Sequence, residues 1–560
     1  MPRHLVNMDA LIPREDFEVH TPEPVTEPSI LSTTMKITDL GPESLIYNVL
    51  RKPDFQRETA NWTPEKVAEL VRSFLEGDLI PSVILWRSPR SGNIFVIDGA
   101  HRLSALVAWV HDDYGDKHTS MRFFDNTIPV EQKRAADGAR KIINDSVGSY
   151  AELSSVLRNP GTSDKSKLRL ARNLSAFALH LQWVVGGAEK AESSFFRINQ
   201  QATPIDQTEL DMIKARRKPN ALAARAFIRA GTGHKYWSDF EVDTQEEIER
   251  IAKEVYELMF RPALETSIRT TDLPAAGRGY SSDSLRMVFE LVNFVNNLTP
   301  DMWQRPAKAP GQRAKEGVAS PLLADDGDGS RTIEFMRAVR KAASRIAGNE
   351  PGSLGLHPAV YFYSATGRFQ PAAFLATVAL VVELEKKKRI AAFTDVRAAF
   401  EEFLVTRKYF LNQIVRNYGS MQRAVGPIHV MHRTVFDCLT RQLAGDEIVV
   451  DLKRQPSLRA SLKEITDDDR QHGRNFSTET KNMIVLRGVL EGATRCGICG
   501  ARVPLGSASI DHRLRKADGG TGMPENGQIA HPYCNTGYKE SRHAQQRGSQ
   551  AALFAMEDNG

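Results

Sequence analysis

The chain has 560 residues, of which 41% are hydrophobic and 26% charged, and its formal net charge is +5. The composition is that of an ordinary soluble protein, and the length excludes a single hydrophobic core, so we expect about three domains. A charge this close to zero permits a nucleic-acid partner without requiring one, because any basic surface must then be local.

The N-terminal sequence MPRHLVNMDALIPRED lacks the continuous apolar stretch of a signal peptide. The most apolar run, residues 372–382, is much shorter than the ~20 residues that a membrane helix needs. We therefore expect a cytoplasmic protein with no membrane partner. Residues 1–34 are rich in Pro, Glu and Thr without hydrophobic periodicity, which predicts an extended lead-in.

The first folded segment shows a helix followed by two strands. Thr63 is a candidate N-cap, Pro64 suits the first helical position, and Gly77 is the expected end of the helix. Strands are expected at 82–86 and 93–98 on hydrophobicity and flanking turn residues.

The second strand runs into Gly99 and then an apolar helix. Such a junction places free backbone N–H groups and the positive end of a helix dipole beside Arg102, which makes it a candidate phosphate site. The alternative is a structural turn in which Arg102 pairs with Asp98.

Two motifs in this part of the chain resemble a known domain. They are the run from Phe55-Gln56-Arg57 and Trp62 to IDGAHRL at 97–103, and FFRINQQATPI at 195–205. In this order they resemble the ParB/sulfiredoxin-like domain at the N-terminus of GmrSD-type modification-dependent restriction enzymes, and we assign this domain to residues 35–220. The resemblance implies a nucleotide- or DNA-sensing site formed by Arg57, Asp98, Gly99, His101, Arg102 and Asn199.

The second half of the Asp-Gly-x-x-Arg motif differs from that of these relatives. Where they have Asp-Gly-Gln-Gln-Arg, this chain has Asp-Gly-Ala-His-Arg, which is closer to the Gly-Cys-His-Arg of sulfiredoxins. Ala100 replaces the sulfiredoxin cysteine and excludes sulfiredoxin chemistry. A metal-bound nucleoside triphosphate and a DNA phosphate both remain candidate ligands, and nucleotide hydrolysis stays open.

The middle of the chain, residues 221–465, has mainly amphipathic helical spacing and no cluster of residues typical of a catalytic site. We expect a helical connector domain, with a Pro/Gly/Asp-rich loop at 305–331, followed by an exposed hinge at 466–480. Helices are expected at 245–259, 282–297, 332–347, 371–387 and 395–416.

Three of the four cysteines lie between residues 496 and 534. Cys496 and Cys499 form one short knuckle, and His531 and Cys534 form another, so that four soft ligands can surround one tetrahedral Zn²⁺. Four protein ligands leave no position for a water, so any chemistry must come from residues between the knuckles. The candidates are Asp511, His512, Asn526 and Asn535.

The order C-x2-C, Asp-His, Asn and Cys-Asn resembles the HNH (ββα-metal) nuclease family, with His531 as the one departure from its usual second cysteine pair. The resemblance implies that His512 is the general base, a role that an imidazole can fill near neutral pH. It also implies that Asp511 and Asn535 hold one catalytic Mg²⁺. Asn526 is expected to fix the loop and orient the His512 ring, and Lys539 to contact a phosphate.

The sequence thus predicts a multidomain α+β protein. It combines the ParB-like α+β N-terminal domain, the largely α-helical middle and a small zinc-stapled ββα-metal nuclease domain at 481–545, with a tail at 546–560. We predict a Mg²⁺-dependent DNA endonuclease that defends against foreign, modified DNA and is gated by the N-terminal domain. Because double-strand cutting by a one-metal site usually needs two copies, we expect a homodimer or larger assembly.

Two other functions stay open at this point. One is a non-cleaving, ParB-like DNA-binding regulator whose zinc ribbon only docks on nucleic acid. The other is an ungated HNH nuclease of the toxin or homing type, which needs no nucleotide.

Overall fold

The computed structural model divides into two compact units, Met1–Leu222 with Gly231–Phe240, and Ala223–Ala230 with Glu241–Gly560. The structure describes residues 5–17, 31–56, 58–60, 62–126, 128–159, 164–201, 207–264, 268, 270–279, 282–298, 323–464 and 475–542. The expected lead-in therefore lies partly outside the described residues, as do most of the 305–331 loop and residues 466–474 of the expected hinge.

The first unit is built on a mixed six-stranded sheet with the order β1-β3-β5-β4-β6-β2. Its strands are β1 (Arg14–Glu15), β2 (Thr34–Lys36), β3 (Leu50–Pro53), β4 (Val83–Arg87), β5 (Ile94–Asp98) and β6 (Ala178–Trp183). The two central strands, β4 and β5, are antiparallel, whereas β5 runs parallel to β3 and β4 parallel to β6.

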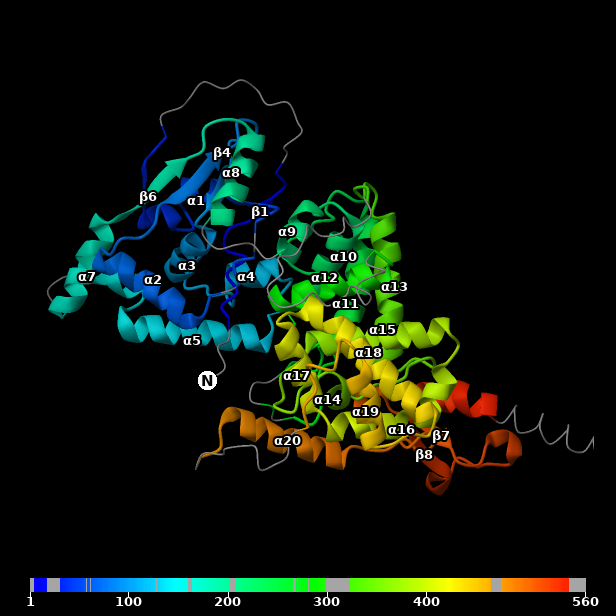
Figure 1. The fold of residues 1–560 in the computed structure, drawn as a ribbon. Coiled ribbons are helices and arrows are strands. Elements are labelled where there is room, and N and C mark those ends of the chain that lie inside the picture. Colours follow the sequence, from blue (N-terminus) through cyan, green and yellow to red (C-terminus); the bar gives the residue numbers. More distant parts are fainter. Residues whose placement is uncertain are drawn as a thin grey trace, which may run out of the picture. The chain divides into compact units, whose positions relative to one another are not determined.

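Helices cover both faces of this sheet (Figure 1). The helices of this unit are α1 (Leu45–Val49), α2 (Pro64–Glu76), α3 (Ala100–His111), α4 (His118–Phe123), α5 (Val130–Ser146), α6 (Tyr150–Arg158), α7 (Lys165–Ala176), α8 (Ala188–Gln201) and α9 (Gln207–Lys214), and the boundary between the two units falls within α10 (Pro219–Ile228). Alternate residues of β5 point to opposite faces, so Val96 joins the core under α2 and α3, while Phe95 and Ile97 join the core under α8.

The helix α2 follows its sequence signals. The Thr63 hydroxyl accepts a hydrogen bond from the Lys66 amide, Pro64 is the first helical residue, and Gly77 ends the helix at φ +82°. That backbone conformation favours glycine, and a Cβ there would also lie 2.7 Å from the Phe177 ring. The predicted cap and stop are confirmed.

The two motifs of the N-terminal domain meet in the core under α8. The Phe55 ring lies 4.9 Å from the Phe195 ring and 6.2 Å from the Phe196 ring, centroid to centroid. Phe55 and Phe195 are almost completely buried. The second motif therefore fastens α8 to the segment that follows β3.

The second unit is largely helical. Its helices are α11 (Val242–Phe260), α12 (Ser282–Val295), α13 (Ser330–Ala347), α14 (Pro358–Tyr361), α15 (Pro371–Lys386), α16 (Ile390–Thr406), α17 (Tyr409–Tyr418), α18 (Met421–Thr440), α19 (Asp446–Arg454) and α20 (Thr478–Gly492). The apolar run 372–382 lies in α15, which is buried on nearly all sides. Within the described part of the chain, no helix combines the length and apolar character needed to span a membrane.

The single helix expected at 395–416 is wrong, because the structure has two helices, α16 and α17, with a break at 407–408. No Gly or Pro marks this break. The buried ammonium of Lys408 donates to the carbonyl oxygens of Ala359 and Val360, which holds the chain at the break against α14. Helix α20, by contrast, begins at Thr478, so the last three residues of the expected hinge are helical.

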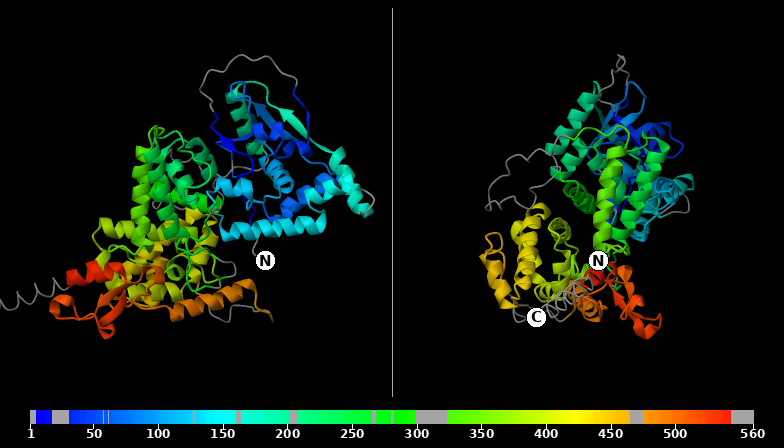
Figure 2. Two further views of the ribbon diagram at one scale, coloured as in Figure 1. Left: turned by 180° about the vertical axis from the view of Figure 1, so that it is seen from behind. Right: turned by 90° about the vertical axis from the view of Figure 1, so that its right-hand side faces the viewer.

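The C-terminal segment of the second unit contains a β-hairpin and a helix. Strands β7 (Ser509–His512) and β8 (Gly527–Ala530) pair antiparallel, and the chain is then helical from 532 to 542 with a π-helical turn, η7 (Cys534–Tyr538). This arrangement is the ββα unit expected from the sequence. In both views of Figure 2 the orange and red segment that contains it lies against the helices of its own unit.

A candidate metal centre and the pocket beside it

The two knuckles bring four ligands together. The ligand atoms of Cys496, Cys499, His531 and Cys534 all lie within 4.8 Å of one another. Nδ1 of His531 is 3.4 Å from Sγ of Cys499 and 3.7 Å from Sγ of Cys534. A tetrahedral Zn²⁺ with bonds of about 2.3 Å to sulfur separates its ligand atoms by about 3.7 Å, so the four residues fit this ion.

The histidine ligand is oriented by a backbone contact. Nε2 of His531 lies 3.0 Å from the carbonyl oxygen of Arg502, so this nitrogen donates and Nδ1 is left for the metal. The backbone amide of Arg502 in turn donates to Glu401 of α16, at 2.8 Å. The Arg502 backbone therefore links the imidazole to the helical part of the unit.

Arg397 lies buried beneath the centre. Its guanidinium donates to the backbone carbonyl oxygens of residues 354 and 355 and to Glu401. Burial by itself lowers the pKa of Arg397, but Glu401, Tyr361 and the sulfur atoms of Cys499 and Cys534 outweigh it and raise the pKa. Three thiolates and one Zn²⁺ carry a net charge of −1, and Arg397 supplies the nearby positive charge.

The loop before α14 packs directly on a ligand. Gly355 has φ +52°, and a Cβ there would lie 2.9 Å from Cβ of Ser507 and 3.3 Å from Cδ2 of His531. The same loop accepts a hydrogen bond from the Tyr533 amide through the Ser353 carbonyl, at 2.9 Å. The metal centre is thus held between the hairpin and this loop.

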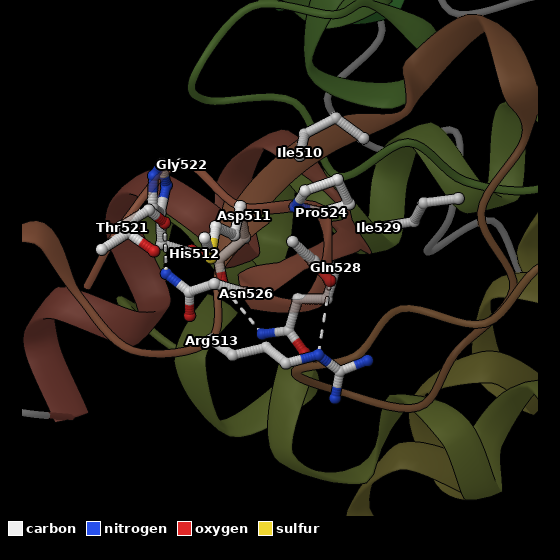
Figure 3. Close-up of a pocket in the computed structure, with 12 residues that line it drawn as sticks. Ile510, Asp511, His512, Arg513, Thr521, Gly522, Pro524, Asn526, Gln528 and Ile529 are labelled. Atoms are coloured by element: carbon white, nitrogen blue, oxygen red, sulfur yellow. Dashed lines mark hydrogen bonds between the residues drawn. The ribbon is translucent and has the colours of Figure 1, made fainter.

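A pocket of about 470 Å³ lies beside the centre, lined by β7, β8 and the loop between them (Figure 3). Asp511 and His512 line it from β7, and Asn526 lines it from the end of the loop. In the hairpin, Asp511 faces Gln528 and His512 faces Gly527.

Asp511 is 3% exposed, and its carboxylate has two partners. Nε2 of Gln528 donates to Oδ2 at 2.7 Å, and Nζ of Lys539 lies 3.0 Å from each carboxylate oxygen. His512 is half-buried, and its ring forms no hydrogen bond with any described residue. Its nitrogens are available to a molecule in the pocket.

The two candidate asparagines have separate positions. The Asn526 side chain accepts from the Leu514 amide at 2.8 Å and donates to the Thr521 carbonyl at 2.7 Å, so it ties the two ends of the loop together. Among the described residues, it makes no hydrogen bond to the His512 ring. Nδ2 of Asn535 donates to Oγ of Ser509 at 2.8 Å, which fixes Asn535 against β7.

Three residues that support this site carry no signal in the sequence. Gln528 is recognisable only once the hairpin register is known, and Arg397 lies far earlier in the chain, in α16. Gly497 lacks the Cβ that would lie 2.2 Å from Oε1 of Gln528. The first knuckle therefore leaves the space in which Gln528 reaches Asp511.

The N-terminal candidate site residues whose side chains the structure describes lie in one short stretch of the chain, residues 98–102. Asp98 ends β5, Gly99 adopts φ +95°, and α3 begins at Ala100. Nη2 of Arg102 donates to Oδ2 of Asp98 at 2.8 Å and to the Ser82 carbonyl at 3.2 Å. A Cβ at Gly99 would lie 3.0 Å from the same nitrogen.

The structure brings four of the six residues expected at this site together, with His101 stacked on Trp62 at 5.7 Å between ring centroids. Arg57 lies outside the described residues. Asn199 lies in α8, but its side chain is also outside the described part of the chain.

Comparison with protein families finds two matches, one in each unit of the chain. Residues 42–216 match the GmrSD restriction endonuclease, N-terminal domain, and residues 496–541 match the HNH endonuclease. No curated protein and no solved structure shows a significant match. The protein therefore joins a GmrSD-type N-terminal domain to a C-terminal HNH endonuclease domain and is a restriction-type nuclease, a phosphodiesterase that acts on DNA.

Proposed function

We propose that the chain cleaves foreign, modified DNA at the Asp511–His512 pocket with one Mg²⁺, and that its N-terminal unit gates this cleavage. The observation that carries the proposal is the convergence of a buried carboxylate, an imidazole without a hydrogen bond to any described residue and an asparagine from the last helix around one hairpin. The Cys/His centre at the start of that helix is proposed to hold a structural Zn²⁺.

His512 is the proposed general base. The attacking water gives its proton to the imidazole as its oxygen bonds to phosphorus, and the bond from phosphorus to the leaving oxygen breaks. Asp511 and Asn535 offer the oxygen ligands that Mg²⁺ prefers, and the bound ion would neutralise charge on the phosphate and the leaving oxygen. Asn526 keeps the loop in place, and the exposed Arg513 beside the pocket can contact a neighbouring phosphate.

The proposed sensor is the junction between β5 and α3. The first turn of α3 offers backbone N–H groups to a phosphate, and Gly99 leaves the helix N-terminus without a side-chain cap. The ligand would be a nucleoside triphosphate or a DNA phosphate, held by Asp98, His101 and Arg102 together with Arg57 and Asn199. The Arg102–Asp98 pair equally suits a structural turn, so the proposal depends on a functional test.

The test is a cleavage assay on unmodified, hydroxymethylated, glucosylated and phosphorothioated DNA, with Mg²⁺ and with or without each nucleoside triphosphate. We expect cleavage of at least one modified DNA. Absence of cleavage by zinc-loaded protein on every substrate would favour the non-cleaving regulator.

Gating is tested by Arg102→Ala, with Arg172→Ala, an exposed arginine on α7, as the matched control. We expect Arg102→Ala to change the nucleotide or modification dependence of cleavage and the control to leave it intact. Identical profiles for both variants and the unmodified protein would favour an ungated nuclease. We further propose a homodimer or larger assembly, which sedimentation with and without DNA would measure.

A further inference from the structure

Lys539 forms the closest charged contact of the proposed magnesium ligand. Its ammonium bridges both carboxylate oxygens of Asp511 and also donates to the carbonyl oxygen of His512. The two side chains are 12% and 4% exposed, so little water separates or screens the charges. The ammonium is therefore the charged partner of this carboxylate inside the fold.

The ammonium contacts the same oxygen atoms that a divalent ion would need. A carboxylate can hold one cation in close contact, and two cations at the same pair of oxygens would repel each other. Lys539 lies one helical turn after Asn535, so both side chains project from the same face of the last helix towards β7. The helix thus presents a metal ligand and a competing positive charge side by side.

The second partner of Asp511 does not compete in this way. The amide of Gln528 is neutral and donates to Oδ2 only, so it can keep its hydrogen bond when a cation approaches Oδ1. If the ammonium withdrew, Asp511 would still be oriented by β8. The geometry is that of a ligand with one permanent support and one exchangeable charge.

We propose that Lys539 is an internal competing cation that sets how much divalent metal the nuclease site requires. Without metal, its ammonium holds Asp511; when metal binds, the ammonium leaves the carboxylate and becomes available to a phosphate beside the pocket. This inference rests on the proposed Asp511 metal site, and it gives that site a threshold concentration of divalent metal.

The test is the affinity of the zinc-loaded full-length protein for Mg²⁺ and Mn²⁺ without DNA, measured by titration calorimetry. Lys539→Met removes the charge and keeps most of the side-chain volume, whereas Lys539→Arg keeps the charge. We expect Lys539→Met to bind the metal at least about tenfold more tightly, the scale of one partly buried ion pair, and Lys539→Arg to stay close to the unmodified protein. Lys516→Met, on the exposed loop of the same hairpin, is the matched control and should leave the affinity unchanged.

A second measurement uses thermal unfolding. The Lys539→Met protein should melt at a lower temperature than the unmodified protein without Mg²⁺ and recover more on its addition, because it leaves Asp511 unpaired until metal binds. Zinc content is measured in parallel, and Lys539→Gln replaces Lys539→Met if the latter does not retain zinc.

Unchanged or weaker metal binding by the zinc-loaded neutral variant would overturn the inference and leave the nuclease proposal standing. If the unmodified protein and Asp511→Asn bind Mg²⁺ and Mn²⁺ equally tightly, or if the zinc-loaded Lys539→Met protein binds neither ion, the metal site itself is misassigned, and both proposals fail.

Discussion

At the N-terminal junction Asp98 pairs with Arg102 one helical turn away, whereas at the C-terminal pocket Asp511 is held by residues 17 and 28 positions along the chain. A pair within one turn forms in many helices for structural reasons alone. At the C-terminal pocket Asp511 and His512 come from β7, the Gln528 amide from β8 and the Lys539 ammonium from the last helix, so tertiary structure must bring three elements together. The C-terminal geometry is therefore the stronger evidence of function.

The largest effect is expected from Cys496→Ser. The metal centre joins the first knuckle to the last helix, and in a module this small the metal-binding free energy is folding free energy. We expect loss of zinc, unfolding of the hairpin region and no cleavage, measured by metal analysis, amide hydrogen exchange and the DNA assay. The N-terminal unit should keep its exchange protection. A zinc-free variant that still cleaves DNA would show that the ligands are misassigned.

His512→Ala should separate chemistry from folding. The ring makes no hydrogen bond to a described residue, so its removal is expected to leave zinc content and melting temperature unchanged. Loss of a general base lowers the rate by about 10²–10⁴-fold. Single-turnover cleavage would measure this change, with Asn48→Ala, on helix α1 of the other unit, as a control that retains the full rate. Normal cleavage by His512→Ala would refute its role as base.

Arg397→Met tests whether the helical part of the second unit supports the metal centre. The change leaves Glu401 buried without its guanidinium and removes donors from two backbone carbonyls. Removing one partner of a buried ion pair costs about 3–5 kcal/mol, which denaturant unfolding would measure. Arg389→Met, at a partly exposed pair with Asp437, should cost less than about 1 kcal/mol. Equal effects would mean that the centre does not depend on α16.

The residues that support the site, Gln528 and Arg397, could not be identified from the sequence alone. Four ligands in two short knuckles and the adjacent Asp511–His512 pair are local patterns, so their clustering could be predicted, and the structure confirms the ligand cluster. Gln528 could not be, since its place opposite Asp511 depends on a hairpin register set across a long loop. Arg397 resembles any arginine of an amphipathic helix until the fold buries it.

The prediction of the fold had the same limit, because local signals could be read from the sequence and long-range contacts could not. Helical periodicity predicted α11, α12, α13 and α15 close to their observed bounds, because this signal acts within a few residues. The break between α16 and α17 depends instead on Lys408, whose ammonium reaches carbonyls about 50 positions earlier in the chain. No local rule contains that contact.

Gly497→Ala tests how far the two knuckles control the pocket. A Cβ would lie 2.2 Å from Oε1 of Gln528, and relief of that clash should move the amide away from Asp511. We expect zinc to be retained and cleavage to fall about tenfold, the effect of one lost hydrogen bond to a charged group. Gly492→Ala, where a Cβ meets nothing within 4 Å, is the control. Loss of zinc in Gly497→Ala would mean that the glycine serves the metal centre alone.

The smallest effect concerns the pH dependence of the helical scaffold. Burial, with a smaller contribution from His429, lowers the pKa of His432 in α18 to about 3, against about 6.5 for a free imidazole. The unfolded chain therefore binds a proton that the folded chain does not, and stability present above pH 6.5 is lost as the pH falls towards 3. His432→Leu should remove about 1.4 kcal/mol of this loss per pH unit. Urea unfolding of both proteins between pH 7 and 5 isolates this contribution, because the other titrating groups, including the zinc ligands, are common to both. Parallel pH profiles would mean that His432 takes up its proton as readily in the folded state as in the unfolded chain, and that the core around α18 tolerates a buried charge.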